Sequence, residues 1–343
     1  MNPHKRVTLR DVAIHAGVST AVVSYVINGG PRPTSAVVRE RVLRTIAELD
    51  YHPDSAARGL RGRRTHTIAF VTYDFLPNES FSSHYLGRML TALTRELQVH
   101  GHYLLMFPLA IGDDPAPLRT LLKSGRLDGI AIRFVQDSPH TDGLLETVFE
   151  SRVPCVCLER PGAQRFGFHA VTYDDAEGAR IATSHLVDLG HCRIAHMYGD
   201  MRYATAQARL ESYKCALIES GLEVDDELIV GSPWNTRQAS FETHRLLDMD
   251  NPPTAIFAAS DDMALGALHA ARDRGLNVPD DLAVVGFDDI PLAEELTPLL
   301  TTVRVPLIEM GERAAQLLAA RSSENDGPLI ETLQVELVRR SST

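Results

Sequence analysis

The sequence predicts an α/β protein in which a small three-helix head precedes a larger body of two doubly wound lobes. Three observations support this fold class: short helical patterns in the first 51 residues, apolar runs that alternate with helical stretches from Thr67 onward, and a change in the sign of the charge between the two parts. The length of 343 residues suits about two domains. We expect a domain at residues 1–51, a linker at 52–65 and a body at 66–343.

The composition excludes several classes of protein. Contents of 44% hydrophobic and 23% charged residues are typical of a globular chain and not of a disordered or collagen-like one. The four cysteines are too few and too scattered for a disulfide framework. The N-terminus lacks the apolar segment of a secretory signal, and no apolar run approaches the roughly 20 residues that span a bilayer. We therefore expect a cytoplasmic protein with reduced thiols and no membrane contact.

The net charge of −11 conceals an asymmetry between head and body. Residues 1–64 hold 11 Lys and Arg against 5 Asp and Glu, whereas the rest of the chain is strongly acidic. A basic head on an acidic body suggests a polyanion-binding module attached to a part that repels polyanions. A basic arm without any partner would have the same charge, so the pattern of the head has to decide between the two.

The head is patterned as three short helices. A polar capping residue precedes each of them, and these residues are Thr8, Ser19 and Ser35. Apolar residues follow at helical spacing: Leu9, Val12 and Ala13; Val22, Val23, Val26 and Ile27; Val38, Val42, Ile46 and Leu49. Gly17 stands between the first two helices, where a tight turn needs a positive φ. This is the layout of a helix-turn-helix.

The second helix of such a unit lies in the major groove of DNA, with its N-terminal side chains at the base edges. Opposite its apolar face are Thr20, Ala21 and Tyr25, which we expect at bases, and Ser24 and Asn28, which suit phosphates. The alternative is that the three helices are a plain packing unit, which is the commoner case. Basic side chains around the head favour DNA: Lys5, Arg6, Arg10, Arg32, Arg39 and Arg41.

Several motifs of the head are more specific than its periodicity. They read LRDVA at 9–13, AGVS at 16–19, VS at 23–24, VIN at 26–28, RERV at 39–42 and LDYHP at 49–53. With these motifs the head resembles the lactose-repressor (LacI/GalR) family of bacterial transcription regulators. Val22 stands where that family usually has Thr, and Tyr25 stands where Arg or His is common. The resemblance therefore implies the mode of DNA binding and leaves the operator sequence open.

Without the family resemblance, the sequence of residues 52–65 predicts an interdomain linker. Its helical pattern is weak, since Gly59 and Gly62 disfavour a helix. The family resemblance implies more: a hinge helix that pairs with its copy in a dimer and inserts Leu60 into the minor groove, with Ala57 on the same face and Arg58 near the phosphates. The DNA contacts expected in all are Thr8, Leu9, Ser19, Thr20, Ala21, Ser24, Tyr25, Asn28, Arg32, Ala57, Arg58 and Leu60.

The body contains continuous apolar runs of the kind that form parallel strands buried on both faces. They lie at 68–71, 103–106, 129–132 and 155–158, and then at 193–197, 228–230, 255–258 and 283–287. The two sets predict two doubly wound lobes. We expect the first lobe at about 66–165 and 298–325, and the second at about 166–297 and 326–343.

Most of these runs end in acidic side chains, among them Asp74, Glu159, Asp174, Asp200, Asp261, Asp262, Asp288 and Asp289. Ligands of open α/β sheets sit beyond the carboxyl ends of the strands, so two facing lobes would line a cleft with carboxylates. That chemistry suits a polyol or a sugar. Each acid could instead cap the helix that follows it, and for most of them we expect capping.

The family resemblance extends over nearly the whole body, through VTYDD at 171–175, LGHCRIA at 189–195, DDMALG at 261–266, VGFDDI at 285–290 and LLTTVR at 299–304. It implies a periplasmic-binding-protein-like (type I) core used as a sensor. In that core Arg209 matches the effector-binding arginine and Asp288 the ligand carboxylate. Glu159, Trp234 and Ser260 match further effector positions, and Asp74 is expected beside them.

No motif points to catalysis or to a metal. The sequence has no HExxH or paired CxxC ligand set, no Walker A or GxGxxG phosphate loop and no GxSxG nucleophile elbow. We therefore expect neither an enzyme nor a metal or cofactor site.

These features predict a ligand-responsive transcription regulator, with a repressor favoured. It would bind palindromic double-stranded operator DNA as a homodimer or a dimer of dimers, under the control of a small-molecule effector that we expect to be a sugar. Two alternatives stay open. One is a regulator of the same architecture that responds to a purine, a nucleoside or a protein partner. The other is an enzyme or a transport-type binding protein with a fused head.

Overall fold

The computed structural model describes residues 7–28, 34–51, 65–73, 84–109, 114–134, 139–159, 165–320 and 327–343. The chain forms two compact units, Met1–Thr65 and His66–Thr343. Within the described ranges no helix has both the length and the apolar character of a membrane span. The predicted hinge at 52–65 lies outside these ranges except for Thr65.

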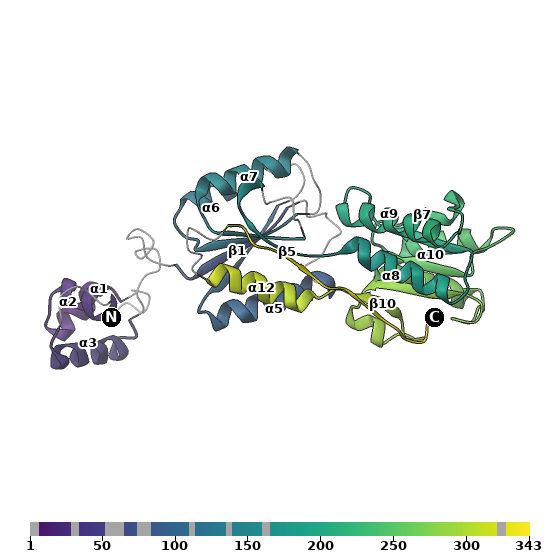
Figure 1. Ribbon diagram of the computed structural model, residues 1–343. Coiled ribbons are helices and arrows are strands. Elements are labelled where there is room, and N and C mark those ends of the chain that lie inside the picture. Colours follow the sequence, from purple (N-terminus) through teal and green to yellow (C-terminus); the bar gives the residue numbers. More distant parts are fainter. Residues whose placement is uncertain are drawn as a thin grey trace. The chain divides into compact units, whose positions relative to one another are not determined.

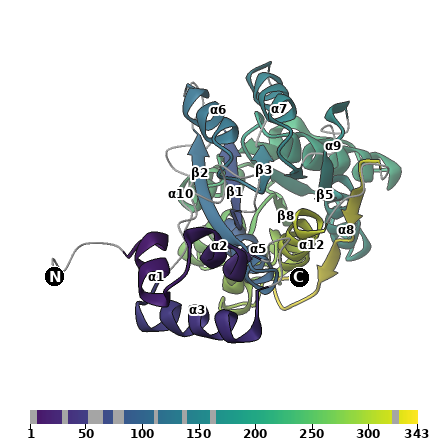
Figure 2. The same cartoon turned by 90° about the vertical axis from the view of Figure 1, so that its left-hand side faces the viewer.

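The first unit contains the three predicted helices, α1 (Leu9–Ala16), α2 (Thr20–Asn28) and α3 (Ala36–Glu48), packed on one another (Figure 2). Thr8 and Ser35 cap the first and third helices, as the sequence predicts. Gly17 ends α1 with a φ of 63°, a conformation that glycine adopts without steric cost. The helices enclose a small core of Val12, Ala13, Ala16, Val23, Val26, Val42 and Tyr51.

The described residues of the second unit form two six-stranded sheets, one in each lobe (Figure 1). The first has the order β11-β5-β4-β3-β1-β2 and is parallel throughout. Its strands are β1 (Thr67–Tyr73), β2 (Tyr103–Leu109), β3 (Gly129–Phe134), β4 (Cys155–Leu158), β5 (His169–Tyr173) and β11 (Ile330–Leu333).

Helices cover both faces of the first sheet, α5 (His84–Val99) and α12 (Leu307–Ala319) on one face and α6 (Ala116–Lys123) and α7 (Pro139–Ser151) on the other (Figure 1). The strand residues alternate accordingly. Ile68 and Phe70 join the core of α5 and α12, whereas Ala69 and Val71 join that of α6 and α7. Burial on both faces explains why these strands read as continuous apolar runs.

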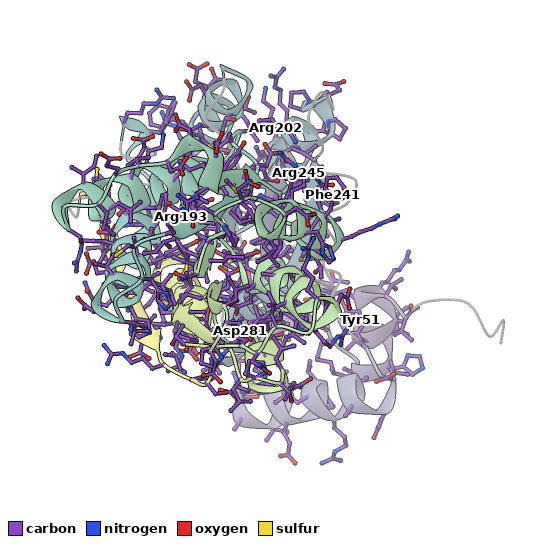
Figure 3. All side chains as sticks on the ribbon, turned by 90° about the vertical axis from the view of Figure 1, so that its right-hand side faces the viewer. Tyr51, Arg193, Arg202, Phe241, Arg245 and Asp281 are labelled. Atoms are coloured by element: carbon purple, nitrogen blue, oxygen red, sulfur yellow. The ribbon has the colours of Figure 1, made fainter. Side chains whose placement is uncertain are left out.

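The second sheet has the order β12-β10-β9-β8-β6-β7, with only β12 antiparallel. Its strands are β6 (Ile194–Tyr198), β7 (Ile229–Gly231), β8 (Ala255–Ala258), β9 (Ala283–Asp288), β10 (Thr301–Arg304) and β12 (Glu336–Val338), and short 3-10 turns lie at Asp226–Leu228 and Pro291–Glu294. One face packs on α8 (Asp175–Asp188) and α9 (Ala204–Glu219), and the other on α10 (Thr236–Leu247) and α11 (Asp261–Asp273). Phe241 and Arg245 of α10 face the solvent (Figure 3).

In the described part of the chain, the polypeptide passes between the two sheets three times. It leaves the first sheet after β5, returns after β10 to form α12 and β11, and then crosses again to β12. The expected lobe boundaries at 165, 297 and 325 each lie one strand too early, because β5 pairs with β4, β10 with β9 and β11 with β5. Apolar runs reveal buried strands, but they do not reveal which sheet a strand at a crossing joins.

Gly311 of α12 lies directly against the backbone of α5 and offers a test of this packing. A Cβ at Gly311 would stand 2.5 Å from the carbonyl oxygen of Met89 and 2.7 Å from the amide nitrogen of Leu93. Backbone atoms cannot move aside cheaply, so we expect Gly311→Ala to lower the free energy of unfolding by about 1–3 kcal/mol. Urea denaturation followed by circular dichroism measures this.

Gly143 of α7 is the matched control for that substitution. It is exposed, and no described atom lies within 4 Å of an added Cβ. Gly143→Ala should therefore stabilise the protein by about 0.5–1 kcal/mol through its helix propensity. Similar losses in both variants would contradict the close approach of α5 and α12.

Candidate functional site

The second helix of the head exposes side chains that the sequence places at DNA. Val23 and Val26 are buried in the head core, whereas Thr20 and Ala21 at the start of α2 are exposed. Ser24 and Tyr25, one turn further on, are half-buried. The exposed N-terminal end of α2 is the part of a recognition helix that enters a major groove.

Other residues of the predicted DNA set lie at the helix starts. Ser19 is exposed just before α2, and its Oγ accepts a hydrogen bond from the amide of Val22 at 3.4 Å. Thr8 is exposed and forms a capping box with Asp11, in which the Thr8 amide donates to Asp11 Oδ2 at 2.8 Å. Leu9 packs against the head core. These contacts give Thr8, Leu9 and Ser19 a structural role in the head.

Part of both predicted sets cannot be placed. Asn28 is the last residue of α2, while Arg32, Ala57, Arg58 and Leu60 lie outside the described residues. Asp74 of the effector set also lies outside them.

Arg209 is the centre of a buried polar cluster where the carboxyl ends of the strands of the two lobes meet. It lies on α9 with only 2% of its surface exposed. Its Nε donates to Asp175 Oδ1 at 2.8 Å, its Nη1 to the carbonyl oxygen of Ala259 at 2.5 Å and its Nη2 to the hydroxyl of Tyr173 at 3.1 Å. The guanidinium also stacks 3.6 Å from the centre of the Phe287 ring, a cation–π contact.

Asp288 lies beside this guanidinium at the end of β9. Its Oδ1 is 3.8 Å from Arg209 Nη1, and the residue is 8% exposed. Burial raises the pKa of the Asp288 carboxyl well above its ordinary value, and the charge of Arg209 opposes that rise. Burial acts to lower the pKa of Arg209, but Asp175, Tyr173 and Asp288 together raise it above its ordinary value, so the guanidinium stays charged.

Glu159 is connected to Arg209 through two tyrosines. It follows β4 of the first sheet and receives Arg133 Nε on both carboxylate oxygens, at 3.0 and 2.9 Å. Tyr85 donates its hydroxyl proton to Glu159 Oε1 at 2.9 Å, so Tyr173, whose hydroxyl is 2.9 Å away, must be the donor to Tyr85. Hydrogen bonds thus run without a break from Arg209 through Tyr173 and Tyr85 to Glu159. We call this the interlobe chain.

Trp234 and Ser260 border this cluster from the second lobe. The Trp234 ring lies 5.8 Å from Arg209 Cζ, and its buried Nε1 has no hydrogen-bond partner among the described residues. Ser260 is buried next to Ala259, and its Oγ caps α11 by accepting from the amide of Met263 at 3.3 Å. The structure therefore brings Glu159, Arg209, Asp288, Trp234 and Ser260 to one region.

Comparisons with known proteins agree with this arrangement. Residues 8–54 match the model of "Bacterial regulatory proteins, lacI family", and residues 183–343 match the "Periplasmic binding protein-like domain". The HTH-type transcriptional regulator DegA of Bacillus subtilis (strain 168) is 33% identical, over 98% of each chain. The chain belongs to the LacI family.

Two solved structures of LacI-family proteins are similar over almost the whole chain. The transcriptional regulator CelR in complex with cellobiose has a TM-score of 0.73 at 32% identity, covering 98% of this chain and 100% of that one. The Lac repressor dimer bound to operator and the anti-inducer ONPF has a TM-score of 0.85 at 27% identity, covering 98% and 99%. The predicted fold class and family are confirmed, and the protein is a ligand-responsive transcription regulator with a helix-turn-helix head.

The sequence did not reveal four members of the cluster in this LacI-family chain: Tyr85, Arg133, Tyr173 and Asp175. Tyr173 and Asp175 flank Asp174, one of the acids that the sequence places at a strand end. Asp174 caps α8 by accepting from the amide of Glu177 at 2.9 Å, and it is the next residue that binds Arg209. The pattern around residue 174 was a usable signal, whereas Tyr85 and Arg133 stand far from any acidic strand end.

Asp261 is a buried carboxyl that ties α11 to β9 and β10. It accepts hydrogen bonds from the hydroxyl of Thr302 at 2.5 Å and from the amide of Ile290 at 2.8 Å. Burial raises the pKa of Asp261 to about 7, although these two hydrogen bonds lower it. The protonated form is thus favoured in the folded protein relative to the unfolded chain.

This raised pKa predicts a pH dependence of stability. A carboxyl of this kind stabilises the fold fully below its unfolded pKa of about 3.9, and the contribution is lost as the pH rises through about 7. A tenfold difference in proton affinity between the folded and unfolded chain corresponds to about 1.4 kcal/mol. We therefore expect the unfolding free energy of the parent to fall between about pH 4 and pH 7 relative to that of Asp261→Asn.

Denaturant titrations at several pH values measure the difference between the two proteins. Asp250→Asn, which changes an exposed carboxylate, is the control and should track the parent at every pH. Parallel pH profiles of the parent and Asp261→Asn would contradict the raised pKa.

Proposed function

We propose that this LacI-family chain is a cytoplasmic repressor, not an enzyme, that binds a palindromic operator as a homodimer and changes its operator affinity when a sugar binds between its lobes. The interlobe chain carries this proposal. It joins Glu159 of the first lobe to Arg209 of the second through groups that also suit sugar hydroxyls. A ligand that replaces these hydrogen bonds acts on both lobes at once, so it alters their relative angle.

The buried charges of the cluster favour an uncharged, hydroxyl-rich ligand. Arg133 is already paired with Glu159, and Arg209 with Asp175 and Asp288. Carboxyl groups of the protein thus already satisfy both guanidinium groups, and a phosphate or carboxylate ligand would add buried negative charge without a partner. Sugar hydroxyls can both donate to carboxylates and accept from arginine. The cellobiose bound to the relative CelR belongs to this chemical class.

The DNA part of the proposal keeps the expected division into a head at 1–51, a hinge at 52–65 and a sensor at 66–343. Thr20, Ala21 and Tyr25 read bases, and Ser24 and Asn28 contact phosphates. The expected contacts of the head also include Thr8, Leu9, Ser19 and Arg32. In the hinge, Leu60 inserts into the minor groove beside Ala57 and Arg58. The exposed start of α2 and the basic charge of the head support this assignment.

The homodimer is supported by an apolar surface on the first lobe. The strand β2 is at one end of the described sheet order, and Tyr103 and Leu105 on it are 69% and 38% exposed. Val99 at the end of α5 adds a third side chain, at 78%. An apolar edge strand of this kind needs a cover. A second copy of the chain is the occupant we propose, because a helix-turn-helix reads one half-site and a palindrome needs two, and the similar Lac repressor binds its operator as a dimer.

Arg209 allows a direct test of the effector site. The parent should bind duplex DNA from upstream of its own coding sequence, and a sugar from a panel that includes cellobiose should change that affinity by about 5- to 150-fold. The fluorescence of Trp234, the single tryptophan, reports binding in the same titration. Arg209→Lys should abolish the response to the sugar and keep ligand-free DNA binding, whereas Arg245→Ala, an exposed control, should behave like the parent.

The outcomes of that titration separate the alternatives. A response to adenine or adenosine and to no sugar would favour a purine or nucleoside effector. Absence of preference for the upstream DNA over random DNA at two salt concentrations would contradict the regulator itself.

Leu105 tests the proposed dimer surface. Leu105→Lys places a charge on the apolar edge and should weaken dimerisation at least about tenfold, the effect of losing a well-packed apolar contact. Sedimentation of the parent and of Leu105→Lys measures the dimer affinity. Leu189→Lys is the control, because Leu189 is an exposed leucine (52%) of the second lobe. Retention of the dimer in both variants would place the interface elsewhere.

A further inference from the structure

The turn that follows β9 has an unusual backbone. Asp288 and Asp289 have φ angles of 109° and 54°, and neither residue is a glycine. Side chains of L residues disfavour such angles, so the conformation persists only where surrounding contacts hold it. The contacts around this turn therefore determine where the carboxylate of Asp288 lies.

Contacts from the second lobe fix the side chain of Asp289 and the peptide after it. Arg304 Nε donates to Asp289 Oδ2 at 2.6 Å, and Arg340 Nη1 forms an ion pair with Oδ1 at 2.8 Å. The amide of Ile290 donates to Asp261 Oδ2 at 2.8 Å. Asp289 is only 5% exposed, so its carboxylate is an anchor and not a ligand contact.

The first lobe supplies a contact to the peptide carbonyl of the same turn. Arg88 lies on α5, and its Nη1 donates to the carbonyl oxygen of Asp289 at 2.7 Å in a partly buried setting. This is a hydrogen bond from a charged donor, the stronger kind. Arg88 therefore reaches from one lobe to the strained backbone of the other.

The Arg88 contact lies close to the connection between β10 and α12, where the chain crosses from the second lobe to the first. The carbonyl of Asp288 accepts from the amide of Val305, which lies between β10 and α12 where the chain returns to the first lobe. The helix α12 then packs along α5, the helix that holds Arg88. The turn after β9 is thus connected to the first lobe in two ways, directly through Arg88 and indirectly through Val305 and α12.

We propose that Arg88 is a positioning residue that makes the placement of the Asp288 carboxylate depend on the relative angle of the lobes. When α5 moves with the first lobe, the bond to the carbonyl of Asp289 is made or lost, and the left-handed turn is held or released with it. Asp288 then changes its distance from Arg209. This inference rests on the proposed role of Asp288 in effector binding and adds the residue through which lobe closure reaches it.

Hydrogen–deuterium exchange of the full-length, effector-free protein tests the proposal. Arg88→Met removes the donor and keeps the apolar stem, whereas Arg88→Lys keeps a charged donor. Arg95→Met is the matched control, because Arg95 is an exposed arginine on the same helix. We expect the amides of residues 286–290 and 292 to exchange about tenfold faster in Arg88→Met, the low end for a lost hydrogen bond to a charged group. Arg88→Lys should restore most of the protection, and Arg95→Met should match the parent.

Two results would overturn the assignment. One is unchanged exchange at 286–292 in Arg88→Met, and the other is a general rise across the second lobe, including α10, that Arg88→Lys does not reverse. If Arg88→Met does not fold, Arg88→Gln, with a shorter neutral donor, gives the same comparison. Because no effector is present, a negative result here leaves the Arg209 titration intact, and failure of that titration leaves this measurement interpretable.

Discussion

The sensor is organised around one buried cation, the guanidinium of Arg209. Its hydrogen-bond partners come from two places far apart in the chain: Tyr173 and Asp175, where β5 leads into α8, and the carbonyl of Ala259 after β8. Phe287 of β9 packs on its face. A charge this deeply buried must be paired, and removing one partner of a buried pair costs about 3–5 kcal/mol. The need to satisfy Arg209 therefore fixes the strand ends of both sheets with respect to one another.

Much of the fold could be predicted because it follows local rules. The capping box at Thr8, the positive φ of Gly17 and the apolar runs that became β1, β3, β4 and β8 all depend on residues close together in the sequence. The strands β5, β10, β11 and β12 were not predicted, since polar residues interrupt their sequences HAVTY, TTVR, IETL and ELV and their place is set by pairing with distant strands. The sequence therefore predicted two lobes joined by three crossings, and the structure moves each crossing one strand further along the chain.

The candidate site shows the same division. Arg209 and Asp288 were found because the sequence around them matches motifs of a known family. Such motifs indicate a site even when its residues lie far apart in the chain. Tyr85 and Arg133 belong to the same cluster as Glu159, yet they stand 74 and 26 positions away from it in the chain. Asp174 and Asp175 illustrate a finer limit, because one caps a helix and the next binds the cation. The sequence places acids at this strand end. Only the geometry of the helix start decides that Asp174 caps α8 and that Asp175 binds Arg209.

The interleaved path of the chain also governs how the protein is made. A ribosome delivers β1 to β4 and α5 early, but α12, which covers Met89 and Leu93 of α5, emerges more than 200 residues later. Until then the apolar side of the nascent first lobe has no native cover, and neither lobe can finish folding before the second lobe has been synthesised. Among the described residues, the core of the three-helix head is built from residues 7–51 alone. Vectorial synthesis thus yields a folded head and an intermediate of the sensor with exposed apolar surface, which is the kind of species that chaperones bind.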